Sequence, residues 1–382
     1  MAKAGDKKES REDRIKRICG SINNGSFGGE KKDAVTYLGS KEAISLERFS
    51  SGCPDLDKAL GGGWPKGRFV ELYGSESGGK TTLALHAIAE HQKKYPDEDC
   101  ALIDTEYAFD EEYARAIGVD TRYLIVNQPE SGEQALNVLS QLINEGVGVA
   151  IVDSVAALTT RGELEGNIGD TKVAEQARLM SGALRRLTME AGRKGATVFW
   201  TNQVREKIGV MFGDKTTTPA GRALKHYASV RVNITRIGSE KEKVDGETII
   251  VSNKVRADVK KNKTAAPFKK AEFFITFGTG IDFAAALLDS ALNAGVVNRK
   301  GARFTIGDDI IGNGRANVLE SMKDPESLVG SQVEAAMAEY YKDQRDKAVV
   351  EKAEAKVKSA GLTDPDGPLA DDGGDDVVEK EV

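Results

Sequence analysis

Cysteine, histidine and long apolar runs are all scarce in this chain of 382 residues. Its three cysteines, Cys19, Cys53 and Cys100, lie far apart without metal-type spacing, so we expect free thiols in a reducing cytoplasm. The three histidines form no ligand cluster in the sequence. A membrane-spanning helix needs about 20 consecutive apolar residues, and because no such run occurs we expect no membrane partner. The charged N-terminus also lacks the apolar stretch of a secretory signal, so we expect a cytoplasmic protein.

The net charge of −6 does not exclude a nucleic-acid partner. The composition, with 40% hydrophobic and 30% charged residues, is typical of a globular protein. Many of the acids cluster among Gly and Pro at the C-terminal end, a composition that cannot bury enough apolar surface to fold. We therefore predict a charged, acidic, disordered tail over residues 343–382, which leaves the rest close to neutral and allows basic surfaces on it.

From about Phe49 onward, short apolar runs alternate with segments of helical periodicity. This alternation predicts an α/β fold in which helices cover both faces of a mostly parallel central sheet, with the later strands as an antiparallel extension. The predicted strands are Phe69–Tyr73, Ala101–Asp104, Val147–Asp153, Thr197–Asn202, Val230–Ile237, Thr248–Val255 and Glu272–Phe277, and the predicted helices are Leu83–Gln92, Gly132–Ile143 and Ala174–Ala191.

Composition divides the chain into an N-terminal segment, a core, a small α+β domain and the tail. Residues 1–47 combine a charged, helix-compatible stretch with a Gly/Asn-rich link, residues 48–282 hold the alternating core, and residues 283–342 form the C-terminal domain. Within the core, two polar loops at about 160–173 and 205–221 are too long for simple connections. Loops of this length tend to carry function, so we expect binding residues in both.

The segment Gly74–Thr82 directly follows a predicted strand and reads Gly-Ser-Glu-Ser-Gly-Gly-Lys-Thr-Thr. It matches G-x-x-x-x-G-K-[ST] in full, with a strand before it and a helix after it. Its glycines let successive backbone N–H groups point at phosphate oxygens, and the helix that starts near Lys80 adds its positive end. Lys80 can reach the β- and γ-phosphates, and the Thr81 hydroxyl can ligate Mg²⁺. The sequence therefore predicts a site for a nucleoside triphosphate.

Acidic residues end two of the predicted strands, at the sheet edge where α/β proteins bind ligands. Asp153 would lie beside Thr81 and hold Mg²⁺ through its water shell, unless it only caps the next helix. Glu106 is placed to orient and deprotonate an attacking water, and Asp104 is its competitor for that role. Gln203 would touch the γ-phosphate and relay its presence into the loop that follows, although amides also simply cap strand ends.

The phosphate loop and these acids belong to a larger set of motifs: Gly74–Thr82, Ile103–Glu106, Val152–Leu158, Glu163–Asp170, Thr201–Arg205, Lys207–Gly213, Ala223–Arg231 and Lys261–Phe268. This set resembles the RecA-type recombinases of bacteria over most of the chain. A phosphate loop alone is shared by many ATPase families, whereas residues 207–213 and 261–268 together are far more specific. The resemblance implies a RecA-type ATPase core at 48–282 and an oligomerisation arm at 1–47.

The resemblance also implies roles around the nucleotide. Tyr113 matches the aromatic residue that stacks on adenine, Asp110 the partner of the amino group, and Phe277 a second aromatic near the base. Lys261 and Lys263 match lysines that reach across a subunit interface to the neighbour's γ-phosphate, although alone they would read as a solvated basic turn. The implied catalytic residues are Glu106, Gln203, Lys80, Lys261 and Lys263; the implied ATP-binding residues are Gly74, Ser75, Glu76, Ser77, Gly78, Gly79, Lys80, Thr81, Thr82, Asp110, Tyr113 and Phe277; and the implied Mg²⁺ site is Thr81 and Asp153.

In RecA-like proteins the two long loops grip single-stranded DNA. Arg178 and Arg185 lie two turns apart on one face of the predicted helix between these loops, so both can address one phosphate track. Ile208 and Val173 match apolar side chains that wedge between base triplets, which implies binding largely independent of sequence. The chain departs from the family pattern at Glu206, Val173 and His226. The implied DNA-binding residues are Val173, Arg178, Ser181, Arg185, Arg205, Lys207, Ile208, Gly209, Met211, Phe212, Gly221 and Arg222.

The resemblance implies an ATP-dependent recombinase that polymerises on single-stranded DNA, pairs it with a homologous duplex and exchanges strands. Its expected cofactors are ATP and Mg²⁺. Its expected partners are single-stranded and duplex DNA, further copies of the chain in a helical filament, a single-strand-binding protein, loader proteins and a LexA-type repressor. Two alternatives stay open: a RecA-core motor ATPase of the helicase-like ring type, and a filament that coats DNA without exchanging strands. The ring motor would need extra domains or a zinc module, which the sequence does not display.

Overall fold

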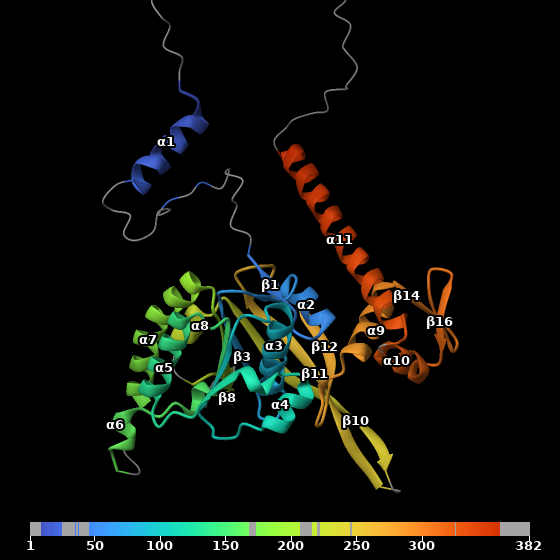
Figure 1. Ribbon diagram of the computed structural model, residues 1–382, viewed down its shortest axis with the longest axis horizontal. Coiled ribbons are helices and arrows are strands. Elements are labelled where there is room, and N and C mark those ends of the chain that lie inside the picture. Colours follow the sequence, from blue (N-terminus) through green and yellow to red (C-terminus); the bar gives the residue numbers. More distant parts are fainter. Residues whose placement is uncertain are drawn as a thin grey trace, which may run out of the picture. The chain divides into compact units, whose positions relative to one another are not determined.

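The computed structural model describes residues 9–24, 35, 37, 46–167, 173–206, 216–219, 222–244, 247–324 and 326–359 (Figure 1). The chain forms two compact units. Unit 1 comprises Met1–Gly52, Leu56–Gly238 and Val255–Ala271, and unit 2 comprises Cys53–Asp55, Ser239–Lys254 and Glu272–Val382. Parts of both predicted DNA loops, 168–172 and 207–215, lie outside the described residues, as does the end of the acidic tail, 360–382.

The largest sheet has nine strands in the order β13-β12-β11-β10-β3-β7-β6-β4-β5. From β10 to β5, each strand is parallel to its neighbours. Only residues 245–246 separate the neighbours β10 and β11, a connection that antiparallel strands use, and β13 is antiparallel to β12. The predicted α/β fold with an antiparallel extension is therefore confirmed. The strands are β3 (Phe69–Gly74), β4 (Cys100–Asp104), β5 (Leu124–Asn127), β6 (Val149–Asp153), β7 (Thr197–Gln203), β10 (Val230–Val244), β11 (Glu247–Asn262), β12 (Lys270–Thr276) and β13 (Gly280–Ile281).

Helices cover both faces of the parallel strands. On one face, Trp200 of β7 and Leu184 of α7 (Val173–Lys194) belong to one buried apolar cluster together with side chains of α5 (Gly132–Glu145). The buried side chains of α3 (Lys80–Lys94) lie outside that cluster, and α3 packs instead against β3, β6 and β7. The remaining elements before β10 are α1 (Arg11–Asn23), β1 (Arg48–Phe49), α2 (Pro54–Leu60), β2 (Trp64–Pro65), α4 (Glu111–Ile117), the 3₁₀ turns η1 (Thr121–Tyr123) and η2 (Val155–Ala157), α6 (Arg161–Leu164), β8 (Arg205–Glu206), β9 (Thr216–Thr217) and α8 (Ala223–Tyr227).

Unit 2 has an apolar core of its own, in which helices pack on the antiparallel sheet β14-β15-β16. Leu288, Phe304 and Val318 are fully buried in this core. Arg315 binds Asp289 through both carboxylate oxygens, at 2.5 and 3.0 Å. The mixture of helices and strands confirms the predicted α+β character of this part of the chain. Its elements are α9 (Phe283–Ala294), β14 (Val297–Lys300), β15 (Arg303–Ile306), β16 (Asp309–Asn313), α10 (Arg315–Lys323) and α11 (Val329–Ser359).

None of the helices in the described part of the chain combines the length and the apolar composition that a bilayer crossing requires. The longest, α11, carries charged residues throughout and continues past residue 342, where we placed the end of the C-terminal domain. At the other end of the chain, α1 begins after Ser10, whose side chain accepts a hydrogen bond from the Asp13 N–H (3.1 Å). Such a cap satisfies one of the backbone donors that the first helical turn leaves unpaired.

Candidate nucleotide and DNA sites

The predicted phosphate loop connects the carboxyl end of β3 to the first turn of α3. Gly79 adopts φ +92°, a left-handed conformation that a residue with a side chain rarely adopts, and α3 begins at the next residue, Lys80. The N-cap residue of α3, Gly79, has no side chain to bond to the first turn. The first N–H groups of the helix therefore face the loop, where an anion would find both donors and the positive end of the helix dipole.

Lys80 lies across this loop. Its ammonium donates to the carbonyl oxygens of Ser75 (2.7 Å) and Gly74 (3.3 Å). Burial lowers the pKa of Lys80, while the nearby carboxylates of Asp153 and Glu106 oppose that shift. The half-buried Lys80 ammonium lacks a fully compensating negative charge around it. A triphosphate bound in the loop would supply that charge, so the geometry fits an anionic ligand.

Thr81 and Asp153 meet at the edge of the sheet, as the sequence predicted for a cation site. The Thr81 hydroxyl donates to Asp153 Oδ2 (2.6 Å), and Thr201 donates to Asp153 Oδ1 (2.5 Å). Burial raises the pKa of Asp153, which marks a carboxylate poorly compensated by its surroundings. A hydroxyl and a carboxylate suit Mg²⁺, which prefers oxygen ligands and needs only one or two from the protein beside a nucleotide. The donor set thus fits the predicted ion.

The structure separates the two acids that compete for the role of general base. Asp104 is buried, and its carboxylate accepts hydrogen bonds from the N–H groups of Glu106, Ala108 and Phe109 and from the Gln128 side chain, at 3.0 to 3.3 Å. Three of those bonds hold the backbone after β4, and the four together leave Asp104 without a free face. Glu106 is exposed, and Ser154 Oγ donates to one of its oxygens at 2.5 Å. Glu106 therefore fits the role better than Asp104.

Gln203 ends β7 directly beside the start of the phosphate loop. The strand register pairs Gln203 with Gly74, and the Val204 N–H donates to the Gly74 oxygen (3.3 Å). The chain then continues into Arg205, the first residue of β8. If the Gln203 side chain contacts the γ-phosphate, this contact lies only two residues before Arg205, a predicted DNA-binding residue.

Two of the residues predicted to hold the base, Asp110 and Tyr113, lie at the start of α4. The Tyr113 hydroxyl lies 2.8 Å from Thr82 Oγ1, which joins α4 to the phosphate-loop helix. Asp110 caps α4 by accepting from the Tyr113 N–H (3.0 Å), so one of its oxygens is already used. Phe277 belongs to unit 2, follows β12, and is 53% exposed. Its role beside the base stays a prediction.

Lys261 and Lys263 lie near the amino end of β3, whereas the phosphate loop lies at its carboxyl end. The Lys263 N–H donates to Ser229, and the Ser229 N–H donates to Phe69, the first residue of β3, whereas the loop follows the last residue, Gly74. At about 3.3 Å per residue the two ends of β3 are separated by roughly 16 Å. Neither lysine therefore reaches the phosphate loop of its own chain.

Both lysines instead bind the carboxyl end of α8. Lys261 Nζ donates to the carbonyl oxygens of Lys225 (2.7 Å) and His226 (3.0 Å), and Lys263 Nζ donates to His226 (3.4 Å). Burial and the neighbouring charge of Lys263 lower the pKa of Lys261 to about 8. Helix α8 begins right after the second predicted DNA loop, so the lysines sit on the element that this loop enters.

The predicted DNA-binding residues on α7 share one exposed face. Arg178, Ser181 and Arg185 are exposed, whereas Met180 and Leu184 are buried in the core. Within the described residues neither arginine forms an ion pair, so both charges are available to a polyanion. Arg205 and Arg222 are also exposed. The structure describes the backbone of Val173 but not its side chain, and Lys207, Ile208, Gly209, Met211, Phe212 and Gly221 lie outside the described residues.

Sequence reasoning missed two side chains that hold the site together. Ser154 fixes Glu106 and Thr201 fixes Asp153, as described above. Ser154 directly follows the strand-end acid, so its position was a usable signal. Thr201 had no such signal, because its role depends on the pairing of β6 with β7, two strands far apart in the chain.

Comparison with known proteins agrees with this geometry. The family models for the RecA N-terminal domain and the RecA C-terminal domain match residues 16–282 and 285–342. The Protein RecA of Brucella canis is 49% identical over 296 residues, which are 77% of this chain and 80% of that protein. The Protein RecA of Rhizobium etli is 48% identical over 306 residues, 79% of this chain and 82% of that protein. The chain therefore belongs to the RecA family of recombinases, which are DNA-dependent ATPases.

Proposed function

We propose that, in a helical filament on single-stranded DNA, the nucleotide site of one chain is completed by Lys261 and Lys263 of the next chain. The observation that carries this proposal is the placement of the phosphate loop and the two lysines at opposite ends of the same strands of one sheet. A surface with complementary groups at opposite ends joins head to tail, which produces an open helix unless the rotation happens to close a ring.

The residues of one chain would divide the work on ATP among them. Lys80 binds the β- and γ-phosphates, and Glu106, held by Ser154, orients the attacking water and accepts its proton. Thr81 and Asp153 would hold Mg²⁺, which when bound neutralises charge on the phosphates. The lysines of the next chain add positive charge where it develops during the reaction. Hydrolysis then depends on assembly, and ATP joins the subunits until it is cleaved.

The exposed face of α7 would bind the DNA backbone. Arg178 and Arg185 supply charge along a phosphate track, and Arg205 and Arg222 extend it toward the second loop. Contacts of this kind carry no sequence information, as a general recombinase requires. The similarity to the RecA proteins supports further partners, namely a homologous duplex, a single-strand-binding protein, loader proteins and a LexA-type repressor, and it supports a cytoplasmic location.

Replacing Lys263 or Lys261 by alanine is expected to lower DNA-stimulated ATP turnover by about 100-fold or more, as when a group that stabilises developing charge is lost. Single chains should still bind ATP, because both lysines lie far from their own phosphate loop. Turnover with single-stranded DNA and binding of a fluorescent ATP analogue measure the two effects separately.

Mixing tests whether the site is shared. A Lys80→Ala chain has an impaired phosphate loop but intact lysines, so it should restore turnover when mixed with Lys263→Ala. The exposed Lys269, in the same connection between β11 and β12, provides a matched control that should keep normal turnover as alanine. Full activity of both lysine variants would contradict the proposal, and electron microscopy of the ATP-bound state would separate a filament from a closed ring.

A further inference from the structure

The segment that carries the two lysines is built around the side chain of Asn262. This side chain is buried, and its oxygen accepts from the Thr264 N–H (2.8 Å), the Thr264 hydroxyl (2.8 Å) and the Ala265 N–H (3.0 Å). Its amide nitrogen donates to the carbonyl oxygen of Leu60 (3.0 Å). The turn after Lys263 is therefore fixed against the chain at the end of α2.

Arg48 binds the same turn from the other side. Its guanidinium donates to the carbonyl oxygens of Thr264 (2.8 Å), Gly63 (3.0 Å) and Leu60 (3.3 Å). Three convergent carbonyl acceptors suit the fixed fork of donors in a guanidinium, whereas a lysine ammonium at the end of a flexible stem would not span them. One side chain of β1 thus joins the chain before α2 to the lysine segment more than 200 residues later.

The backbone between these groups approaches closely. Gly61 adopts φ +87°, and a Cβ added there would lie 2.4 Å from the Ala265 Cβ. A side chain at this position would push the 264–265 turn away from the end of α2. The contact of the lysine segment with the Leu60–Gly63 turn is therefore tight, so a displacement of one moves the other.

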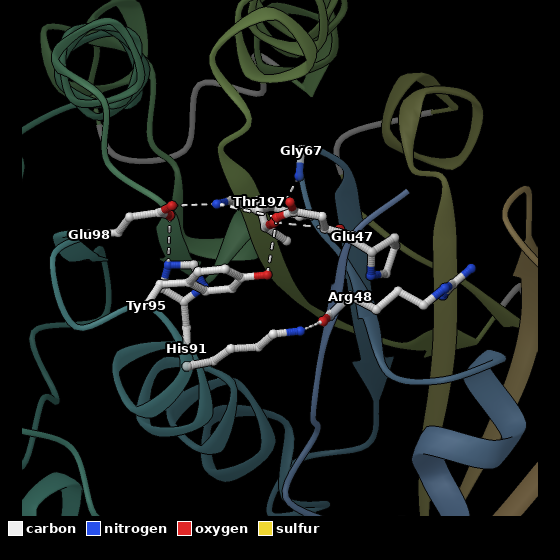
Figure 2. A network of polar contacts seen from close by, with 10 residues as sticks. Glu47, Arg48, Gly67, His91, Tyr95, Glu98 and Thr197 are labelled. Carbon is white, nitrogen blue, oxygen red and sulfur yellow. Dashed lines mark hydrogen bonds and ion pairs between the residues drawn. The ribbon is translucent and has the colours of Figure 1, made fainter. Parts of the chain in front are cut away.

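The backbone of Arg48 is held by a separate network (Figure 2). Lys94 donates to the Arg48 carbonyl oxygen, and the Tyr95 hydroxyl donates to the Glu47 carboxylate (3.2 Å). Lys66 lies between Glu47, at 3.8 Å, and Glu98, with its ammonium 4.0 Å from the centre of the Tyr95 ring. Figure 2 shows the Arg48 side chain leaving this network in the opposite direction. The network holds residues 47–48 in place, and the Arg48 guanidinium connects them to Thr264 by a hydrogen bond.

We propose that Arg48 is a positioning residue for ATP hydrolysis: it holds Lys261 and Lys263 in place for the phosphates of the neighbouring chain. This inference rests on the shared site proposed above. Arg48 directly follows the predicted oligomerisation arm, residues 1–47. A change in the position of Glu47–Phe49 would be passed to the lysine segment through one guanidinium.

Replacing Arg48 by glutamine should lower DNA-stimulated turnover by about 10- to 100-fold, the scale expected when a reacting group is misplaced by about 1 Å. Binding of a fluorescent ATP analogue to single chains should stay unchanged. Arg122→Gln is the matched control, because this exposed arginine pairs with Asp120 and its described contacts include neither residues 47–48 nor residues 262–265, so it should keep normal turnover. Arg48→Lys retains the positive charge without the fork and should lose turnover as well.

Complementation shows which half of the shared site the variant damages. In a mixture with Lys80→Ala, the Arg48→Gln chain contributes an intact phosphate loop and the Lys80→Ala chain contributes correctly placed lysines. Turnover should therefore recover. Mixed with Lys263→Ala it should not recover, because every lysine segment in that filament is impaired. The triple variant Arg48→Gln/Lys261→Ala/Lys263→Ala should be no slower than Lys261→Ala/Lys263→Ala, since Arg48 acts only through these two lysines.

The outcomes separate this inference from the proposed function. If Lys263→Ala retains DNA-stimulated turnover, the shared site itself is wrong. If Lys263→Ala loses turnover but Arg48→Gln and Arg48→Lys keep it, only the role of Arg48 is wrong. Recovery in the mixture of Arg48→Gln with Lys263→Ala would place the damage at the phosphate loop or in the fold of the variant, and would also overturn the role of Arg48.

Discussion

Replacing Lys80 by alanine is expected to lower ATP turnover by about 100- to 1000-fold, the range found when one group that stabilises developing charge is removed. Lys80 is the only cation of the G-x-x-x-x-G-K-[ST] motif, and its ammonium lies directly over the loop, bound to the carbonyl oxygens of Gly74 and Ser75. Nucleotide-dependent filaments should disappear with it. Hydrolysis with single-stranded DNA, and imaging with ATP, measure both effects.

The same helix offers a matched control for Lys80. Lys93 lies in the last turn of α3, is mostly exposed, and donates to the Glu90 carboxylate (2.5 Å). Lys93→Ala should leave turnover normal, since Lys93 lies at the opposite end of α3 from the phosphate loop. Lys80→Arg separates charge from shape, because it keeps the cation but replaces the compact ammonium with a planar guanidinium. Full strand exchange by Lys80→Ala would contradict the assignment of the site.

The sequence predicted the parallel strands well where apolar residues form continuous runs. The buried strands β4, β6 and β7 start and end within two residues of their predicted bounds. The edge strand β5 was missed because Ile125 and Val126 are each 42% exposed and the run is only four residues long. The long hairpin of β10 and β11 was predicted too short, since the charged residues that extend Val230–Ile237 to Val244 give no apolar signal.

The candidate site was predictable as far as its residues are close in sequence. A phosphate loop is a local motif, so Lys80 and Thr81 could be assigned from spacing alone. The choice between Glu106 and Asp104 required the structure, because only the hydrogen bonds show that Asp104 is committed to the backbone. Arg48 had no local signal at all, because its acceptor Thr264 is brought to it only by the completed fold.

Replacing Glu106 by glutamine is expected to lower hydrolysis by about 100- to 10,000-fold, the range that a positioned general base contributes. ATP binding should persist, because Lys80, Thr81 and Asp153 are unchanged. Filaments should therefore form with ATP and fail to release it, which a turnover assay and a filament-lifetime measurement detect together. Glu111→Gln is the control: Glu111 is exposed, pairs with Arg115 on α4 and should leave turnover normal.

Asp104 provides the decisive contrast with Glu106. Asp104→Asn weakens three hydrogen bonds from the backbone after β4 and one from the Gln128 side chain, so it should lower thermal stability and nucleotide binding together. Glu106→Gln should lower turnover alone, because the one described hydrogen bond to its side chain comes from Ser154 and an amide oxygen can still accept it. Near-normal hydrolysis by Glu106→Gln would transfer the role of base to another acid. Stable filaments that bind ATP without cleaving it would place the proton transfer at Glu106.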